Sequence, residues 1–222
     1  MSQAVMTTFE FVRPVTLDEA LDELAQDGSV ALAGGTDLVP MRVSRVIDPA
    51  RIVDLKSIEE LNVFVVRDDG ARIGAAVTMR RAGQLAGCTL AALADGASIV
   101  GSALTRNRAT VGGNVCRSSP AGDTLPSLLV LGAKAHIASS SRRREVEIAD
   151  FFTGPGQNVL EAGEILVSLA IPRATGASAY RRLTYRKWMD LAVVGVAAWI
   201  ELDAEGRCRD AAVAFGGGAP TP

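Results

Sequence analysis

The segment RNRATVGGNVCRSSPAGDTLP, from Arg106 to Pro126, is the most informative part of this 222-residue chain. It places two adjacent glycines after a β-branched run and contains no histidine and one cysteine. An earlier segment, AGGTDL from Ala33 to Leu38, repeats the arrangement of Gly-Gly followed by small polar residues. We expect each Gly-Gly to form a tight turn directly after an apolar strand.

These two turns suit an anion as well as an ordinary change of chain direction. Successive backbone N–H groups in such a turn converge on negative charge, and glycine lets a phosphate approach the backbone closely. The side chains of Thr36, Thr110 and Asn114 add further donors. The sequence lacks the dinucleotide-binding GxGxxG and Walker patterns, so from spacing alone both interpretations stay open.

Asp123 also allows two interpretations. It precedes TLPSLLVLGA, which is predicted to be a helix, so its carboxylate is placed to cap that helix. Alternatively, Asp123 accepts a hydrogen bond from a hydroxyl or amino group of a ligand.

The rest of the chain mixes helices and strands without strict alternation, which indicates the α+β class. A helix is predicted after Thr16, whose hydroxyl forms a capping box with Glu19, and Gly28 is expected to close it. LNVFVVRDDGARIGAAVT is expected to be a β-hairpin. A boundary is predicted between Pro172 and Gly176, followed by two strands around a DAEG turn.

Composition excludes several classes of protein. Hydrophobic residues make up 48% and charged residues 22% of the chain, and the net charge of −2 does not suggest nucleic-acid binding. The three cysteines show no metal-ligand spacing. The longest apolar run, residues 191–200, is about half the length of a membrane span, and no secretory signal is evident, so we expect a cytoplasmic protein.

The motifs AGGTDL, RNRATVGGNVCRSSPAGDTLPSLLVLGA, EILVSLAIP and YRRLTYRKWMDLAVVGVA occur in this order. Together they resemble the FAD-binding (medium) subunit of the molybdenum hydroxylases, which include xanthine dehydrogenase-like and aerobic carbon monoxide dehydrogenase-like enzymes. The resemblance implies the vanillyl-alcohol-oxidase/MurB type of FAD fold over residues 1–173, in two subdomains of about 1–56 and 57–173. Residues 177–222 resemble the beginning of the family's C-terminal domain, which we expect to be incomplete here.

The same resemblance implies which residues bind FAD. The diphosphate is expected between the two glycine turns, Asp123 at the adenosine half, the backbone of Leu166 on the adenine side, and Lys187 near the flavin. The full set is Ala31, Leu32, Ala33, Gly34, Gly35, Thr36, Asp37, Leu38, Thr110, Val111, Gly112, Gly113, Asn114, Asp123, Leu166 and Lys187. No catalytic acid or base and no metal ligand is implied.

By resemblance, the chain passes electrons from [2Fe–2S] clusters of a small partner subunit through FAD to NAD, a quinone or dioxygen. Molybdenum cofactor belongs to a large partner subunit, and the expected assembly is a heterohexamer, a dimer of heterotrimers. The lone His136 and Cys116 are interpreted as packed side chains, so FAD is expected to be noncovalent; Tyr185 and Trp188 fit either packing or the flavin. The alternatives are a stand-alone FAD oxidoreductase of the same fold and a non-redox assembly module.

Overall fold

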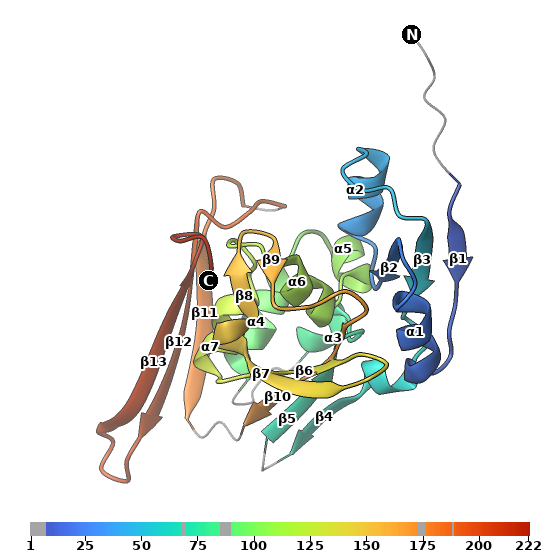
Figure 1. Cartoon of the computed structure of the whole chain (residues 1–222). Coiled ribbons are helices and arrows are strands. Elements are labelled where there is room, and N and C mark those ends of the chain that lie inside the picture. Colours follow the sequence, from blue (N-terminus) through green and yellow to red (C-terminus); the bar gives the residue numbers. More distant parts are fainter. Residues whose placement is uncertain (1–7, 68–69, 85–89, 173–175, 188) are drawn as a thin grey trace.

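The described residues form three larger β-sheets, one two-stranded sheet and a layer of short helices (Figure 1). The computed structural model describes residues 8–67, 70–84, 90–172, 176–187 and 189–222. In Figure 1 the N-terminal sheet lies on the right, the C-terminal sheet on the left, and the largest sheet with its helices between them. The mixture of helices and sheets confirms the predicted α+β class.

The N-terminal sheet is parallel, in the order β1-β3-β2. Its elements are β1 (Glu10–Val12), α1 (Leu17–Leu24), β2 (Ser29–Leu32), α2 (Leu38–Val43) and β3 (Arg51–Asp54). The predicted capping box is confirmed, because the Glu19 N–H donates to Thr16 Oγ1 over 3.2 Å and the Thr16 N–H donates to Glu19 Oε2 over 3.3 Å. The helix ends at Leu24, before Gly28, so Gly28 does not close it as predicted. Gly28 instead adopts φ +74° in the turn that leads into β2.

The central sheet is antiparallel, in the order β4-β5-β10-β6-β7. Its strands are β4 (Phe64–Arg67), β5 (Gly70–Gly74), β6 (Lys134–Ala138), β7 (Arg143–Glu147) and β10 (Ile165–Pro172). The predicted hairpin pairs β4 with β5, although the turn residues 68–69 lie outside the described residues. Alternate side chains such as Ile73, Ile137 and Leu169 enter the main hydrophobic core.

Four helices contribute side chains to the main core on one face of the central sheet. They are α3 (Met79–Ala82), α4 (Ala91–Ile99), α6 (Val111–Arg117) and α7 (Leu125–Val130), and α5 (Ala103–Arg108) packs beside α3. Side chains that point to the opposite face, such as Ala138 and Val167, belong to a second core with α1 and β3. The central sheet is therefore packed from both sides, with the N-terminal elements on one side and the helices on the other.

The C-terminal sheet is antiparallel, in the order β11-β12-β13, and packs against α4 and α7. Its strands are β11 (Ala177–Leu183), β12 (Val194–Leu202) and β13 (Cys208–Gly216). The smaller elements are η1 (Glu59–Asn62), α8 (Ile148–Phe151), β8 (Phe152–Gly154) and β9 (Gln157–Asn158). The two strands around DAEG are confirmed, and β11 adds a third that the sequence did not predict.

Helices form at three places where the sequence did not predict them. The segment Arg106–Pro126 contains the end of α5 and all of α6, α2 follows the first Gly-Gly, and the chain leaves the sheet after Glu147 to form α8. Two glycines give VGGNVCR poor helix propensity, so tertiary packing and capping decide its conformation. None of the helices in the described part of the chain has the length and apolar character that crossing a membrane requires.

Candidate functional site

The first glycine turn, loop 1 (Ala33–Leu38), connects the edge strand β2 to α2. Gly35 adopts φ +77°, which reverses the chain here. Within the described chain, no group accepts a hydrogen bond from the backbone N–H of any residue from Ala33 to Asp37. Residues 33–36 are half-buried. Consecutive N–H donors without acceptors in a half-buried loop are the groups that bind an anion.

Loop 1 lies against the residues that precede the second glycine turn. A Cβ on Gly34 would overlap the carbonyl group of Arg108 and would lie 2.9 Å from the Cα of Ala109. Only glycine permits this approach of two backbones. The two glycine segments, which are more than seventy residues apart in sequence, therefore lie next to each other in the fold.

The second turn, loop 2 (Thr110–Asn114), is the first turn of α6 and does not follow a strand. It comes after α5 and a single β-bridge between Thr110 and Thr78, so the prediction of a preceding strand is wrong. The N–H groups of Val111 to Asn114 are used inside the protein: Val111 donates to Val77 O, Gly112 to Ala75 O, Gly113 to Thr110 Oγ1 and Asn114 to Thr110 O, over 2.9–3.0 Å.

This bonding corrects the expectation that both turns offer free N–H groups. Thr110 caps α6 with its hydroxyl oxygen, so its side chain stabilises the helix before it serves any ligand. The donor that loop 2 retains is the amide nitrogen of Asn114, because Asn114 Oδ1 accepts the Thr124 hydroxyl over 2.6 Å. Loop 1 contributes backbone donors and loop 2 contributes a side chain.

Gly112 and Gly113 of loop 2 lack a side chain for different structural reasons. A Cβ on Gly112 would overlap the Ala75 side chain and lie 2.7 Å from the Ala75 Cα, so Gly112 is required for packing against the end of β5. A Cβ on Gly113 would lie 3.0 Å from Thr110 Oγ1 and 4.0 Å from the Cβ of Ala33 in loop 1. Gly113 therefore faces the gap between the two loops rather than the core.

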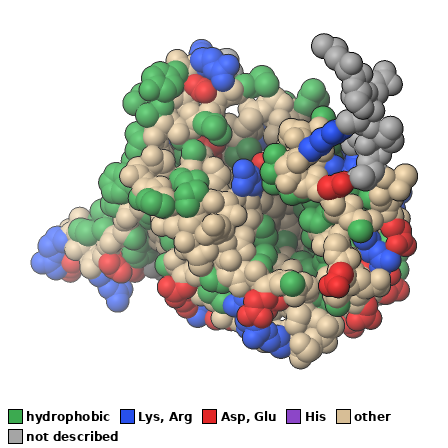
Figure 2. Space-filling model, turned by 45° about the horizontal axis from the view of Figure 1, so that its top comes forward, with side chains coloured by type: hydrophobic (Ala, Val, Ile, Leu, Met, Phe, Trp, Pro, Cys, Tyr) green, Lys and Arg blue, Asp and Glu red, His purple; other side chains and the backbone are tan. Residues whose placement is uncertain are grey.

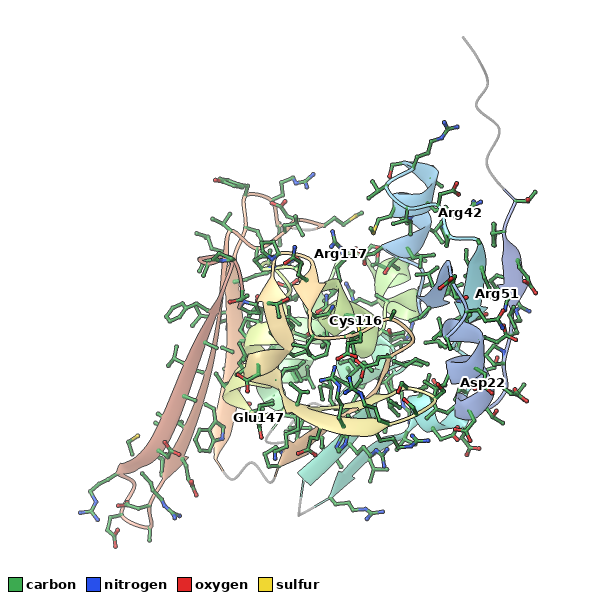
Figure 3. All side chains as sticks on the ribbon, in the orientation of Figure 1. Asp22, Arg42, Arg51, Cys116, Arg117 and Glu147 are labelled. Atoms are coloured by element: carbon green, nitrogen blue, oxygen red, sulfur yellow. The ribbon has the colours of Figure 1, made fainter. Side chains whose placement is uncertain are left out.

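An ion pair closes one end of this gap. Arg117, at the end of α6, has Nε 3.3 Å from Asp37 Oδ1 of loop 1, and Figure 3 shows Arg117 extending from α6 on the side of α2. Figure 2, which brings the end of the molecule with α2 forward, shows a hollow near the middle of this face with basic and apolar side chains around it. The guanidinium also offsets the Asp37 charge beside the free N–H groups.

Asp123 does not cap α7. The N-cap residue is Thr124, and the carboxylate of Asp123 instead accepts the Tyr180 hydroxyl over 2.9 Å and a guanidinium N–H of Arg182 over 2.6 Å. Asp123 is 7% exposed, and this burial raises its pKa, while the charge and hydrogen bonds of Arg182 act in the opposite direction. The capping interpretation was wrong because β11, which the sequence did not reveal, supplies both partners.

The remaining predicted site residues lie in three places. Ala31 and Leu32 end β2 and lead into loop 1, both half-buried. Leu166 is 2% exposed and packs in the same core as Val111. Lys187 is exposed in the segment between β11 and β12. Sequence reasoning missed Thr124, Tyr180 and Arg182; the alternation of polar residues along β11 was the signal that could have found the last two.

Four other residues were considered as functional groups in the sequence: His136, Cys116, Tyr185 and Trp188. His136 is half-exposed beside Glu145, with Nε2 3.6 Å from the carboxylate, so it is not a packed histidine; it faces away from the core that contains α6. Burial raises the pKa of the Cys116 thiol to about 12, which supports its interpretation as a packed residue. Tyr185 is 90% exposed, which excludes core packing, and Trp188 lies outside the described residues.

No metal-ligating group was predicted, and among the described residues no cluster of His, Cys, Asp or Glu can hold a metal ion. Cavities of about 350, 650 and 300 Å³ lie at the end of α1, beside β13 and on the outer face of the central sheet, respectively. None of these three is lined by loop 1 or loop 2.

Comparisons with known proteins identify the family of this chain. A family model described as "FAD binding domain in molybdopterin dehydrogenase" matches residues 7–174. The nicotinate dehydrogenase FAD-subunit of Eubacterium barkeri is 36% identical over 221 residues, 95% of this chain and 75% of that protein. The xanthine dehydrogenase FAD-binding subunit of Escherichia coli O157:H7 is 36% identical over 218 residues, 95% of this chain and 74% of that protein.

The fold is also found in a solved structure. Quinoline 2-oxidoreductase from Pseudomonas putida 86 superposes with a TM-score of 0.90 at 30% identity, covering 98% of this chain and 77% of that chain. The resemblance inferred from the motifs and the fold it implied are thereby confirmed. The chain belongs to the family of FAD-binding domains of molybdopterin dehydrogenases, and its cofactor is FAD.

Proposed function

We propose that this chain is the FAD-binding electron-transfer subunit of a multi-subunit molybdenum hydroxylase. It receives electrons from [2Fe–2S] clusters in a small partner subunit and passes them to an external acceptor such as NAD, a quinone or dioxygen. Substrate is oxidised in a large partner subunit that holds the molybdenum cofactor. The observation that carries this proposal is the row of unpaired backbone N–H groups from Ala33 to Asp37, beside the Gly113 face of loop 2.

The residues present fit the diphosphate of FAD. Loop 1 offers backbone N–H groups that no described residue accepts, and loop 2 offers the Asn114 amide without any lysine. Bound FAD supplies the redox chemistry, and the protein binds and orients it. The proposed contacts extend from Ala31 and Leu32 through both loops to the backbone of Leu166 and to Lys187. Asp123, which is bonded to Tyr180 and Arg182, is proposed to stabilise the site through the neighbouring Thr124.

The proposed FAD is noncovalent. The only histidine of the chain, His136, lies on the face of the central sheet opposite the core of α6, so it is not placed to bond a flavin held by the two loops. Cys116 remains a thiol at neutral pH because its pKa is raised to about 12.

The proposed partners are a large molybdenum subunit and a small two-cluster subunit, in a dimer of heterotrimers in the cytoplasm. Relatives named as subunits or medium chains, such as the carbon monoxide dehydrogenase medium chain of Hydrogenophaga pseudoflava, support a multi-subunit assembly. Native mass spectrometry of the co-expressed complex measures the stoichiometry. A stable monomer that binds no partner contradicts this part of the proposal.

Hydrogen exchange tests the site directly. With added FAD, the amides of residues 33–37 should become protected, because they gain acceptors, whereas the amides of residues 111–114 should exchange slowly in both states. Equal, FAD-independent exchange in loop 1 would contradict the assignment.

Flavin reduction separates the alternatives. The proposal expects a yellow chain whose flavin bleaches only in the assembled complex, with xanthine, nicotinate and carbon monoxide as the substrates tried first. Bleaching of the isolated chain by one of these substrates favours a stand-alone oxidoreductase. A chain that stays colourless with added FAD is a non-redox assembly module.

A further inference from the structure

One face of β11 is joined to the FAD-binding region by polar side chains. Ser178, Tyr180 and Arg182 alternate along the strand and so point to the same side. Ser178 Oγ accepts the Ala92 N–H of α4 over 3.1 Å. Tyr180 and Arg182 both donate to Asp123, and Arg182 also donates to the Ile99 carbonyl over 3.2 Å. The C-terminal sheet is therefore held at fixed points on α4 and before α7.

The contacts with Asp123 are buried. Tyr180 is 2% exposed, and the side chain of Arg182 is 10% exposed. A buried carboxylate is strongly disfavoured unless it is paired, so Asp123 cannot leave these two donors cheaply. Burial raises the pKa of Asp123 and that of Tyr180, and the nearby carboxylate raises that of Tyr180 further. The position of Asp123 is fixed by β11.

The next residue carries this constraint into loop 2. Thr124 is fully buried, and its hydroxyl donates to Asn114 Oδ1 over 2.6 Å. A donor on Oδ1 fixes which end of the amide faces Thr124, so the Nδ2 donors of Asn114 face the other way. Without Thr124, the Asn114 amide is free to rotate and to present its oxygen to an anion.

We propose that Arg182 is a positioning residue for the FAD site, acting through Asp123 and Thr124 to hold the Asn114 amide as a donor. Arg182 lies in the C-terminal sheet and bonds Asp123 and Ile99, neither of which belongs to the glycine loops. Docking of the C-terminal sheet thereby raises the affinity of loop 2 for FAD. This inference rests on the proposed function, because it requires that loop 2 binds FAD.

The test measures the dissociation constant of FAD for the full chain, by flavin fluorescence, in single and double variants. Thr124→Val removes the donor and keeps the shape of the side chain, and it should weaken FAD binding about tenfold; Thr124→Ser keeps the hydroxyl and should bind like the wild type. Arg182→Met should weaken binding in the same direction. Arg181→Met, whose exposed side chain bonds Asp95 instead, is the matched control.

A double-mutant cycle with Asn114→Ala distinguishes positioning from general stability. If Thr124 acts through Asn114, Thr124→Val should have no further effect on FAD binding in the Asn114→Ala background. Additive effects, or unchanged FAD affinity in Thr124→Val, would overturn the inference. The Thr124 pair leaves no buried charge, so it tests the Thr124–Asn114 step even if Arg182→Met does not fold. Arg182→Met combined with Asp123→Asn then tests the Arg182 step without a buried unpaired carboxylate, and unchanged FAD affinity in that double variant would overturn the role of Arg182. If the wild-type chain binds no FAD, the proposed function itself fails.

Discussion

Exchanging the two neighbouring glycines of loop 2 for alanine should have opposite consequences. Gly113→Ala should leave the fold intact and lose flavin, whereas Gly112→Ala should lose stability. A Cβ on Gly113 enters the gap between the loops, 4.0 Å from the Cβ of Ala33, where we propose the diphosphate lies. A Cβ on Gly112 overlaps the Ala75 side chain and lies 2.7 Å from its Cα.

The magnitudes follow from helix propensity and packing. Alanine is more favourable than glycine in a helix by about 1 kcal/mol, so Gly113→Ala should stabilise the apoprotein by up to that amount, less the cost of its 3.0 Å approach to Thr110 Oγ1. Overpacking at Gly112 should cost about 1–3 kcal/mol. For a chain of this size each kcal/mol moves the Tm by roughly 2–4 °C. FAD affinity of Gly113→Ala should fall at least about tenfold, or about 1.4 kcal/mol.

Two measurements on each purified variant check this: the Tm of the apoprotein by circular dichroism, and the flavin content after dialysis against FAD. Gly113→Val, with a larger side chain, should lose more flavin than Gly113→Ala. Normal flavin content in Gly113→Ala at an unchanged or raised Tm would refute the reasoning, because the diphosphate would then not pass the Gly113 face. Loss of flavin only together with loss of fold would refute it as well.

Two further predictions concern parts of the chain outside the glycine loops. Hydrogen bonds from Arg144, assisted by Arg142, lower the pKa of Glu164 from 4.5 to about 2. A carboxyl group whose pKa is lowered by folding stabilises the protein above its unfolded-state pKa, and this stabilisation is lost as the pH falls from 4.5 toward about 2. Glu164→Gln should therefore lower the Tm at pH 7 and flatten the dependence of the Tm on pH in that acidic range. Exposed Cys208 should react with iodoacetamide in the native protein, whereas Cys116, with its raised pKa, should react only after unfolding, as peptide mass mapping will show.

The sequence predicted the elements whose signals are local. The capping box of α1, the hairpin of β4 and β5, and the strands around DAEG are each set by residues close together in the chain. Both Gly-Gly segments were recognised in the sequence, but only loop 1 is a tight turn after a strand, whereas loop 2 is the first turn of α6.

What the sequence could not predict depends on distant partners. VGGNVCR is helical because Gly112 fits against Ala75 and Thr110 caps the first turn, and a propensity scale registers neither the close approach nor its geometry. Asp123 was assigned to a helix cap on local grounds, but the burial of β11 against α4 and α7 gives it Tyr180 and Arg182 instead. Tertiary context outweighed a plausible local signal in both cases.

In the proposed site, the two glycine loops contribute to FAD binding in different ways, and this difference explains why both loops are needed. Loop 1 keeps its N–H groups unpaired, which costs free energy in a half-buried position until an anion accepts them. In loop 2, the N–H groups of residues 111–114 donate to the carbonyls of Val77 and Ala75 and to the cap residue Thr110, so this loop is rigid before any ligand binds. This arrangement favours a ligand with negative charge on the side that faces loop 1, because such a ligand accepts the loop 1 N–H groups without disturbing the hydrogen bonds of α6. Removing donors from loop 1 should therefore cost affinity, whereas filling the Gly113 face should exclude the ligand altogether.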